Sequence, residues 1–313
     1  MFEQRITLIV STFGAVGVNW TSAVRRYWLP WWRSRNMAQE GVLDLKQDQP
    51  HSARIYDYFL GGQDNYEADR QAADRIEQAI PNVRMVARTN RDFMARAVEY
   101  IGRQGVRQFL DIGTGIPTEP NLHQVAQGAH ADARVVYVDN DPIVLAHARA
   151  LLKGTPEGRT TYVHGDVTKP EAILAAPALR DTLDFDRPIA LSLIALCHFV
   201  PTEQIYDILD SLVAPLASGS YLVITHLTAD FDPETVAGTV RAYGESGIRM
   251  EARDHAGVAR FFENLELVEP GIVAIEDWRT DTHQEHEPEV VSLGIDTAQR
   301  PPAAGYAAIG RKP

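Results

Sequence analysis

The residues with the clearest chemistry follow a short apolar run near the middle of the chain. The run Phe109-Leu-Asp-Ile ends in Gly113, Thr114 and Gly115. Glycine has no Cβ, so a turn of this kind lets a ligand lie directly against backbone N–H groups. The acidic residue before the turn, Asp111, suits a ligand that carries a positive charge, such as a sulfonium or an amino group. A strand, a glycine turn and a helix together form the unit that binds a phosphate or a nucleoside in doubly wound α/β folds.

The same turn argues against a bound pyrophosphate. The dinucleotide fingerprint has a third glycine three residues after the second, and this chain has Thr118 there. Pro117 and Pro120 also remove two N–H groups that a diphosphate would need close to the start of a helix. A sulfonium or amino group therefore fits the turn better than a diphosphate, and an NAD-dependent oxidoreductase is the weaker alternative.

Further polar residues stand at the carboxyl ends of the next predicted strands. Asp139 and Asn140 end the second strand, and Asp166 with Val167 follows the third. Ligands of open α/β sheets bind at these ends. A carboxylate after the second strand can accept hydrogen bonds from two ribose hydroxyls. An aspartate beside an apolar residue after the third suits the polar edge and flat face of adenine. Each acid taken alone is more often a helix cap.

The fourth predicted strand brings Ala195 and the residues up to Phe199 to the same edge. A general base is needed here only if the reaction removes a proton during attack. Tyr58, His198 and His226 are the candidates by location. His198 follows an apolar strand, so a buried structural histidine explains it equally well, and no residue is assigned as catalytic.

The elements that position these residues alternate between strand and helix from about residue 106 onward. We predict strands over 106–112, 134–139, 160–164, 188–199, 221–225, 267–275 and 306–310. Helices are predicted over 67–79, 87–103, 120–129, 141–153, 202–216, 233–245 and 255–262. The long apolar run 188–199 indicates a strand buried on both faces of a parallel sheet. These patterns predict an α/β fold.

Before the sheet, residues 48–66 form an aromatic and polar segment that ends at Gly61-Gly62. One interpretation is a lid over the glycine turn, with aromatic and amide groups that face a ligand. The alternative is a surface helix with a glycine C-cap. Four arginines of the helix predicted next are expected on its solvated face: Arg88, Arg91, Arg96 and Arg103.

Residues 1–36 differ in composition from the rest of the chain. They hold four of the five tryptophans, and five arginines against a single acid. Their apolar part, 6–18, is too short to span a bilayer, which needs about 20 residues. A membrane-surface segment is one interpretation; the favoured one is a mis-assigned start, with Met37 as the true beginning. We therefore predict an atypical leader (1–36), a helical lid segment (37–104) and a ligand-binding α/β domain (105–313).

The composition limits the kinds of molecule that the protein is expected to bind. The net charge of −12 argues against a general nucleic-acid binder, because phosphate affinity needs clustered Lys and Arg. A single cysteine, Cys197, excludes an internal disulfide and fits a reducing compartment, so a cytoplasmic protein without stable membrane insertion is expected. His283 and His286 have helical spacing but lie in an acidic loop, and we predict no metal site.

The motifs together resemble one family. Phe109–Gly115, Val138–Pro142 and Gly165–Val167 look like motifs one to three of class I S-adenosylmethionine-dependent methyltransferases. The segments 50–66 and 87–94, the run His198-Phe-Val-Pro and the tail Gly310-Arg-Lys-Pro resemble the actinobacterial S-adenosyl methyltransferases, long filed as a domain of unknown function. The resemblance covers about residues 45–313 and no single piece carries it.

The resemblance implies a Rossmann-like class I fold, with seven strands, the last antiparallel, and helices on both faces. It implies S-adenosylmethionine as cofactor, with the methionine part at the glycine turn, the ribose at Asp139 and the adenine at Asp166 and Val167. The acceptor expected is a small molecule, because the fourth strand leads into Cys-His-Phe-Val-Pro rather than the Asn-Pro-Pro-Tyr type of segment of amide-nitrogen methylating enzymes. A non-catalytic S-adenosylmethionine-binding regulator remains an alternative, and the oligomeric state is open.

Overall fold

The computed structural model describes residues 46–144, 154–280 and 304–313. All of them belong to one unit of the chain, Leu45–Pro313. The predicted leader (1–36), most of the helix predicted over 141–153, and the loop with His283 and His286 lie outside the described residues. None of the helices within the described ranges is long and apolar enough to cross a membrane.

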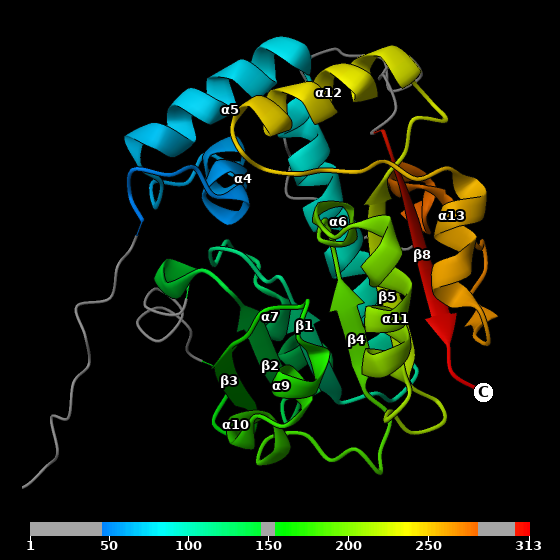
Figure 1. The fold of residues 1–313 in the computed structure, drawn as a ribbon. Coiled ribbons are helices and arrows are strands. Elements are labelled where there is room, and N and C mark those ends of the chain that lie inside the picture. Colours follow the sequence, from blue (N-terminus) through cyan, green and yellow to red (C-terminus); the bar gives the residue numbers. More distant parts are fainter. Residues whose placement is uncertain (1–45, 145–153, 281–303) are drawn as a thin grey trace, which may run out of the picture. The chain divides into compact units, whose positions relative to one another are not determined.

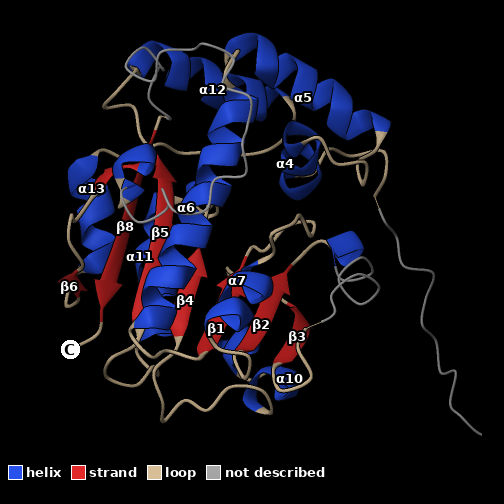
Figure 2. Cartoon of the chain, turned by 180° about the vertical axis from the view of Figure 1, so that it is seen from behind, coloured by secondary structure: helices blue, strands red, loops and turns tan. Residues whose placement is uncertain are grey.

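A mixed sheet forms the centre of this unit, and its strands follow the order β3-β2-β1-β4-β5-β8-β6 (Figure 1; β6 is labelled in Figure 2). The strands are β1 (Gln108–Ile112), β2 (Arg134–Asp139), β3 (Arg159–His164), β4 (Ala190–Leu193), β5 (Tyr221–Leu227), β6 (Glu266–Leu267), β7 (Val273–Ala274) and β8 (Gly305–Arg311). β1 to β5 pair in parallel, and β8 is antiparallel to β5. The strand order reverses between β1 and β4, which is the point where open α/β sheets bind ligands. The predicted α/β fold with a mostly parallel sheet is confirmed.

The strand predicted over 267–275 is divided in the structure. β6 and β7 are two short pieces that both pair antiparallel with β8. Val268 still donates its N–H to the carbonyl of Ile309, but residues 269–272 leave the ladder, and Gly271 takes a left-handed φ of +87° there. An apolar sequence pattern does not reveal such a break, so the single predicted strand corresponds to two strands in the structure.

The predicted strand 188–199 is too long, because β4 ends at Leu193. Ala195 has a φ of +53°, and a 3₁₀ turn follows over Cys197–Phe199. Cys197 and Val200 still pack into the sheet core after the backbone has turned. Apolar character therefore continues beyond the strand and conceals its end.

Helices cover both faces of the sheet (Figures 1 and 2). They are α4 (Ser52–Leu60), α5 (Glu67–Ala79), α6 (Val83–Arg103), α7 (Leu122–Ala129), α9 (Pro170–Leu174), α10 (Pro177–Arg180), α11 (Thr202–Val213), α12 (Pro233–Glu245) and α13 (His255–Ala259). α5 and α12 have the predicted bounds, and α6 begins four residues earlier than predicted. The helix predicted over 255–262 is α13 followed by a 3₁₀ turn, Arg260–Phe262.

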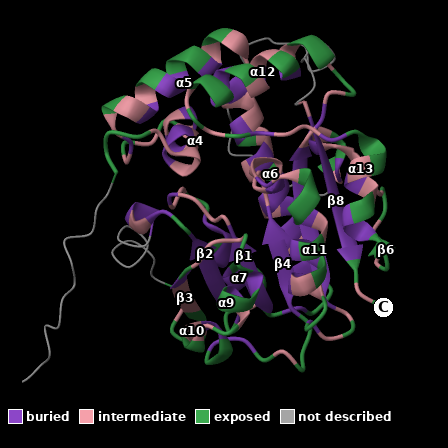
Figure 3. Ribbon diagram, viewed as in Figure 1, coloured by how far each residue is buried: buried purple, intermediate pink, exposed green. Residues whose placement is uncertain are grey.

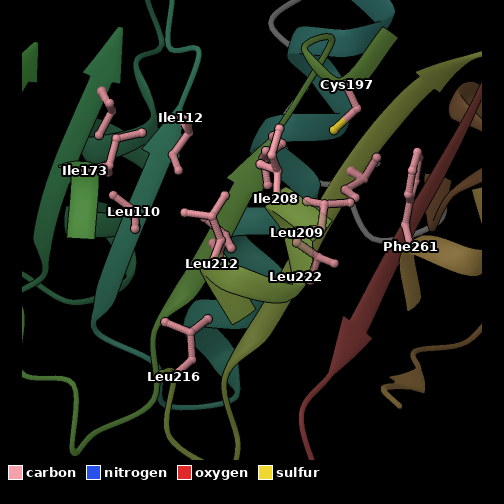
Figure 4. Packing of buried hydrophobic residues seen from close by; sticks show 14 of the residues in the cluster. Leu110, Ile112, Ile173, Cys197, Ile208, Leu209, Leu212, Leu216, Leu222 and Phe261 are labelled. Carbon is pink, nitrogen blue, oxygen red and sulfur yellow. The ribbon is translucent and has the colours of Figure 1, made fainter. Parts of the chain in front are cut away.

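Alternate residues of each strand enter different cores, as the two-residue period of a strand requires. Leu110 and Ile112 of β1 pack with α9 and α11 on one face (Figure 4). Phe109, which directly precedes Leu110, packs with α6 and α7 on the other. The inner strands β1, β2, β4, β5 and β8 are accordingly almost wholly buried (Figure 3), whereas β3, β6 and β7 are partly exposed.

A third apolar cluster lies beyond the carboxyl ends of β1, β4 and β5, where α4, α5 and α12 meet (Figure 1). Ile55 and Phe59 of α4 are buried in it, together with Tyr243 of α12 and Met250. α4 does end in the predicted glycine C-cap, Gly61, with a φ of +85°. Because its apolar side is buried, however, α4 is part of a helical layer above the strand ends and no isolated surface helix.

Candidate active site

A pocket lies between the carboxyl ends of the strands and this helical layer. Its volume is about 210 Å³. A single water needs only about 10–15 Å³ by the same kind of measure, so the pocket has room for a small molecule. Residues of α4, α6, α12 and the ends of β1, β2, β4 and β5 line it. It therefore lies at the edge where the sequence places its polar residues.

The glycine turn after β1 forms part of the floor of this pocket. Gly113 has a φ of +74°, and a Cβ built there would lie 2.7 Å from Cδ1 of Leu196. Its N–H donates to the carbonyl of Val138 at 2.8 Å. Gly115 has a φ of +67°, but a Cβ there would meet nothing within 4 Å. Gly113 is thus required by packing as well as backbone geometry, whereas Gly115 leaves open space for a ligand.

Asp139, at the end of β2, is buried in the same pocket. Its Oδ2 accepts from the N–H of Gly115 at 2.8 Å, and its Oδ1 accepts from the N–H of Asp141 at 2.9 Å. Burial raises the pKa of the Asp139 carboxyl. A carboxylate has about four acceptor positions, so both oxygens keep capacity for ligand hydroxyls.

Asp111 provides a second buried carboxyl group. Ser192 donates to its Oδ1 at 2.5 Å. Burial raises the pKa of Asp111, the charge of Asp139 raises it further, and hydrogen bonds from Ser192 and Thr114 oppose these effects. Two neighbouring carboxyl groups removed from water favour a positively charged ligand between them.

The expectation that the arginines of α6 form a solvated face is wrong for two of the four. Arg91 lines the pocket, and its Nη2 donates to the carbonyls of Thr118 and Pro120. Arg96 is buried, and it donates to the carbonyls of Trp278 and Ile275. The helical pattern placed these arginines away from the apolar stripe, but the turn after β1 and the 3₁₀ turn Ile275–Asp277 cover that side of α6.

Most of the predicted ligand-binding residues come together. The pocket is lined by Asp111, Gly113, Thr114, Gly115, Asp139, Asn140, Val167 and Ala195. Asp166 is not among the lining residues, and its Oδ1 accepts from the N–H and the hydroxyl of Thr168. That is the turn-capping arrangement which the sequence left open for each acid.

The three candidates for a general base differ in position. His198 and His226 line the pocket, whereas Tyr58 does not. The hydroxyl of Tyr58 donates instead to Asp74 on α5 at 3.2 Å, in an exposed position. Tyr56, half a helical turn earlier, lines the pocket and donates to the carbonyl of Ala87 at 2.9 Å.

A buried ionic network ties α4 to the polar strand ends. Nε of Arg54 lies 3.2 Å from Asp141, and its Nη1 lies 3.5 Å from Asp69 of α5. All three side chains are at most 2% exposed. His51, just before α4, adds an Nδ1 contact of 3.3 Å to Asp141. Since Asp141 also donates its N–H to Asp139, the helical layer is linked directly to the carboxylate in the pocket.

The pocket has two parts of different character. We call the part at the strand ends the polar half; it comprises Asp111, Gly113–Gly115, Asp139, Asn140, Gly165 and Val167. The part made by members of the third apolar cluster is the apolar half; it comprises Tyr56, Phe59, Ile80, Val83, Ala87, Phe199, Leu227, Tyr243 and Met250. The sequence did not predict the apolar half, because its members come from segments far apart in the chain.

The sequence also did not identify two polar residues of α6 as part of the pocket. Asn90 and Arg91 of α6 line the pocket, and Oδ1 of Asn90 is buried without a hydrogen-bond partner among the described residues. Both lie in the segment 87–94, which carries part of the family resemblance. That resemblance was the signal that could have identified them.

A family model described as S-adenosyl methyltransferase matches residues 38–313. The chain belongs to this family. A solved structure of a DUF574 family protein from Streptomyces avermitilis is 48% identical, with a TM-score of 0.78, and the match covers 86% of this chain and 100% of that one. A Thermobifida fusca protein described as a methyltransferase is 39% identical, with a TM-score of 0.76, over 87% of this chain and 99% of that one. None of the curated proteins compared with the chain matches it.

The methyltransferase uses S-adenosylmethionine, as its family does, and the NAD-dependent alternative is set aside. The residues of the polar half fit this cofactor. Buried carboxyl groups at Asp111 and Asp139 suit a cation and hydroxyl donors, and Gly115 leaves open space. The unpartnered Oδ1 of Asn90 offers one further acceptor to a ligand N–H or O–H.

Proposed function

We propose that the polar half of the pocket binds S-adenosylmethionine and that the apolar half binds a small-molecule methyl acceptor beside it. The observation that carries this proposal is the convergence of Asp111, Asp139 and the glycine turn on one pocket that continues into an apolar cluster. In this arrangement the turn holds the methionine part, Asp139 accepts from the ribose hydroxyls, and Gly165 with Val167 borders the adenine.

When bound, the cofactor supplies a methyl group that is already activated, so the protein contributes mainly positioning and exclusion of water. Asp139 is suited to positioning, because two backbone N–H groups fix its carboxylate. Ala195 and Leu196 also line the pocket. The N–H of Ala195 donates to Oγ1 of Thr225 at 2.8 Å, which supports its left-handed φ of +53°. Such a sparsely populated conformation persists where the surroundings hold it, often at ligand sites.

Titration calorimetry with S-adenosylmethionine tests the cofactor assignment. Asp139→Asn is expected to weaken binding by roughly 100-fold or more, because it removes a charged acceptor of several hydrogen bonds, each worth about 1.5–3 kcal/mol. Asp166→Asn should cost less than about 10-fold, since its carboxylate already caps Thr168. Asp132→Asn, which replaces a half-exposed acid before β2, is the matched control and should leave the affinity unchanged. Equal affinities for Asp139→Asn and Asp132→Asn would refute the assignment.

Incubation with a labelled methyl donor and a metabolite extract tests the acceptor assignment. Label is expected in a compound of low molecular weight. Label that appears only in macromolecules, or cofactor binding without any label transfer, would contradict a small-molecule acceptor.

We also propose a cytoplasmic location, which the free and buried Cys197 supports. Fractionation of the native cells, followed by detection of the protein, tests it, and recovery from the extracellular fraction would contradict it.

A further inference from the structure

A histidine of the pocket has a buried ring nitrogen without a hydrogen-bond partner. His198 lines the pocket next to the apolar half, and its Nδ1 is buried and bonds to none of the described residues. A buried polar atom without a partner costs about 1–3 kcal/mol. Because native structures seldom keep such an atom without a reason, the imidazole is a candidate contact for a ligand.

The neighbouring histidine cannot serve the same purpose. Arg253 donates from Nη1 to Nε2 of His226 at 2.7 Å, and arginine has only donors. The proton of neutral His226 is therefore on Nδ1, which lies 2.7 Å from the carbonyl of Leu227 and donates to it. Both nitrogens of His226 are occupied. Of this pair, His198 alone is available to a ligand.

The charge state of His198 restricts what it binds. Burial and the positive charge of Arg253 lower the pKa of His198 to about 3. Arg253 itself is held by the carbonyls of Cys197 and Val200, so its charge stays fixed beside the two histidines. A neutral imidazole has one donor and one acceptor nitrogen. A hydroxyl group, which both donates and accepts, satisfies either tautomer.

The walls around His198 are aromatic and apolar. The ring of Phe199 lies 4.4 Å from that of His198 and 5.9 Å from that of Tyr243, measured between centroids. Burial raises the pKa of Tyr243, so its hydroxyl stays uncharged. Flat ligands gain from packing against such rings.

We propose that the methyl acceptor is an uncharged, planar aromatic small molecule whose hydroxyl group hydrogen-bonds to the imidazole of His198. His198 then determines which acceptors bind, as a specificity residue, and the aromatic walls hold the ring system. This inference rests on the proposed function, since it takes the polar half to be filled by the cofactor.

Equilibrium binding of three probes to the full chain saturated with S-adenosylhomocysteine tests the inference. 2-Naphthol has the planar ring and a hydroxyl, 2-methylnaphthalene has the same shape without a polar group, and 2-naphthoate carries a negative charge. 2-Naphthol is expected to bind most tightly. His198→Phe should weaken 2-naphthol by about 3- to 10-fold, the equivalent of one neutral hydrogen bond, and leave 2-methylnaphthalene unchanged. His198→Gln, which keeps a donor and an acceptor, should restore much of the loss.

His255→Phe makes the same replacement at an exposed histidine and should bind all three probes like the wild type. Thermal unfolding and affinity for S-adenosylhomocysteine are measured for each variant, so a folding defect is separated from a binding defect. Failure of the wild type to bind S-adenosylhomocysteine would refute the proposed function. If the cofactor binds normally, three results would refute this inference and leave the proposed function standing. These are that no probe binds, that 2-naphthoate binds as tightly as 2-naphthol, or that His198→Phe weakens the binding of both neutral probes equally.

Discussion

The two halves of the pocket are built in different ways. The polar half consists of residues at the carboxyl ends of parallel strands, and backbone groups fix it: Gly113 bonds to Val138, and Asp139 accepts from Gly115 and Asp141. The apolar half consists of side chains from α4, α6, α12 and the turn after β4, together with Ile80, Leu227 and Met250, and packing fixes it. The first is local to each strand end, whereas the second exists only once distant helices have met.

This difference suggests that the two halves bind different kinds of ligand. A frame made of backbone and buried carboxyl groups suits one invariable ligand, such as a cofactor. A surface made of replaceable side chains suits an acceptor whose identity is set by the residues present. Arg54 links the helical layer to the strand ends, because it pairs with Asp69 of α5 and with Asp141 after β2.

Arg54→Met should give the largest effect, because it breaks the link between the halves. It leaves Asp69 and Asp141 buried without the guanidinium that pairs with both, and loss of one member of a buried ion pair costs about 3–5 kcal/mol. Urea denaturation measures this loss in the free energy of unfolding. Arg70→Met, at an exposed ion pair with Glu67, is the matched control and should cost at most about 1 kcal/mol.

The same variant also shows whether the halves act together. Cofactor affinity measured under folding conditions should fall as well, because Asp141 orients Asp139. Similar stabilities for Arg54→Met and Arg70→Met would show that the ionic network does not hold the layer. Lower stability with unchanged cofactor affinity would show that the two halves are independent.

The different construction of the two halves also explains which parts of the fold and of the pocket could be predicted from the sequence. The strand ends were predictable, because a two-residue alternation ending in Asp139 or in the glycine turn places those residues by local rules. The bounds of β2, α5 and α12 were predicted for the same reason. The end of β4 was not, because buried apolar residues continue through the turn after Leu193.

Local sequence patterns could not predict the apolar half or the side chains that face it. Arg91 and Arg96 are polar residues on the polar side of a helix, and only tertiary contacts place them inside. Tyr56 and Tyr58 are two positions apart on one helix, so the pattern alone did not show which of them reaches the pocket. Position along the chain determines the polar half, whereas helix docking determines the rest.

Substitutions at the two glycines of the turn should give the next largest effects and separate folding from binding. Gly113→Ala places a Cβ 2.7 Å from Leu196 and keeps a left-handed φ, so it should destabilise the fold by about 1–3 kcal/mol. Gly115→Ala has the same φ penalty without the contact, so it should destabilise less but weaken cofactor binding, because its methyl group enters open space. Thermal unfolding and calorimetry measure the two quantities. Adding Leu196→Ala to Gly113→Ala should recover part of the stability, and no recovery would mean that the contact is not the cause.

Acidification should give the smallest effect and should affect the polar half selectively. The pKa values of Asp111 and Asp139 are raised, mainly by burial, so these groups take up protons above the usual pH range of a carboxyl. In the free protein this uptake favours folding, because the folded state binds more protons than the unfolded state between the two pKa values. A cationic ligand with hydroxyl donors prefers the ionised carboxylates, so its affinity should fall as the pH is lowered through the same window.

The stabilisation that S-adenosylmethionine gives against thermal unfolding should therefore shrink as the solution is acidified from neutral pH. Asp139→Asn removes one of the two titrating groups and should make this dependence shallower. Binding of 2-naphthol beside His198 should change less between pH 5.5 and 7.5, because the pKa of His198, about 3, lies well below that range. If acidification weakened the acceptor probe as much as the cofactor, the two halves would share their titrating groups, and the separation drawn between them would be wrong.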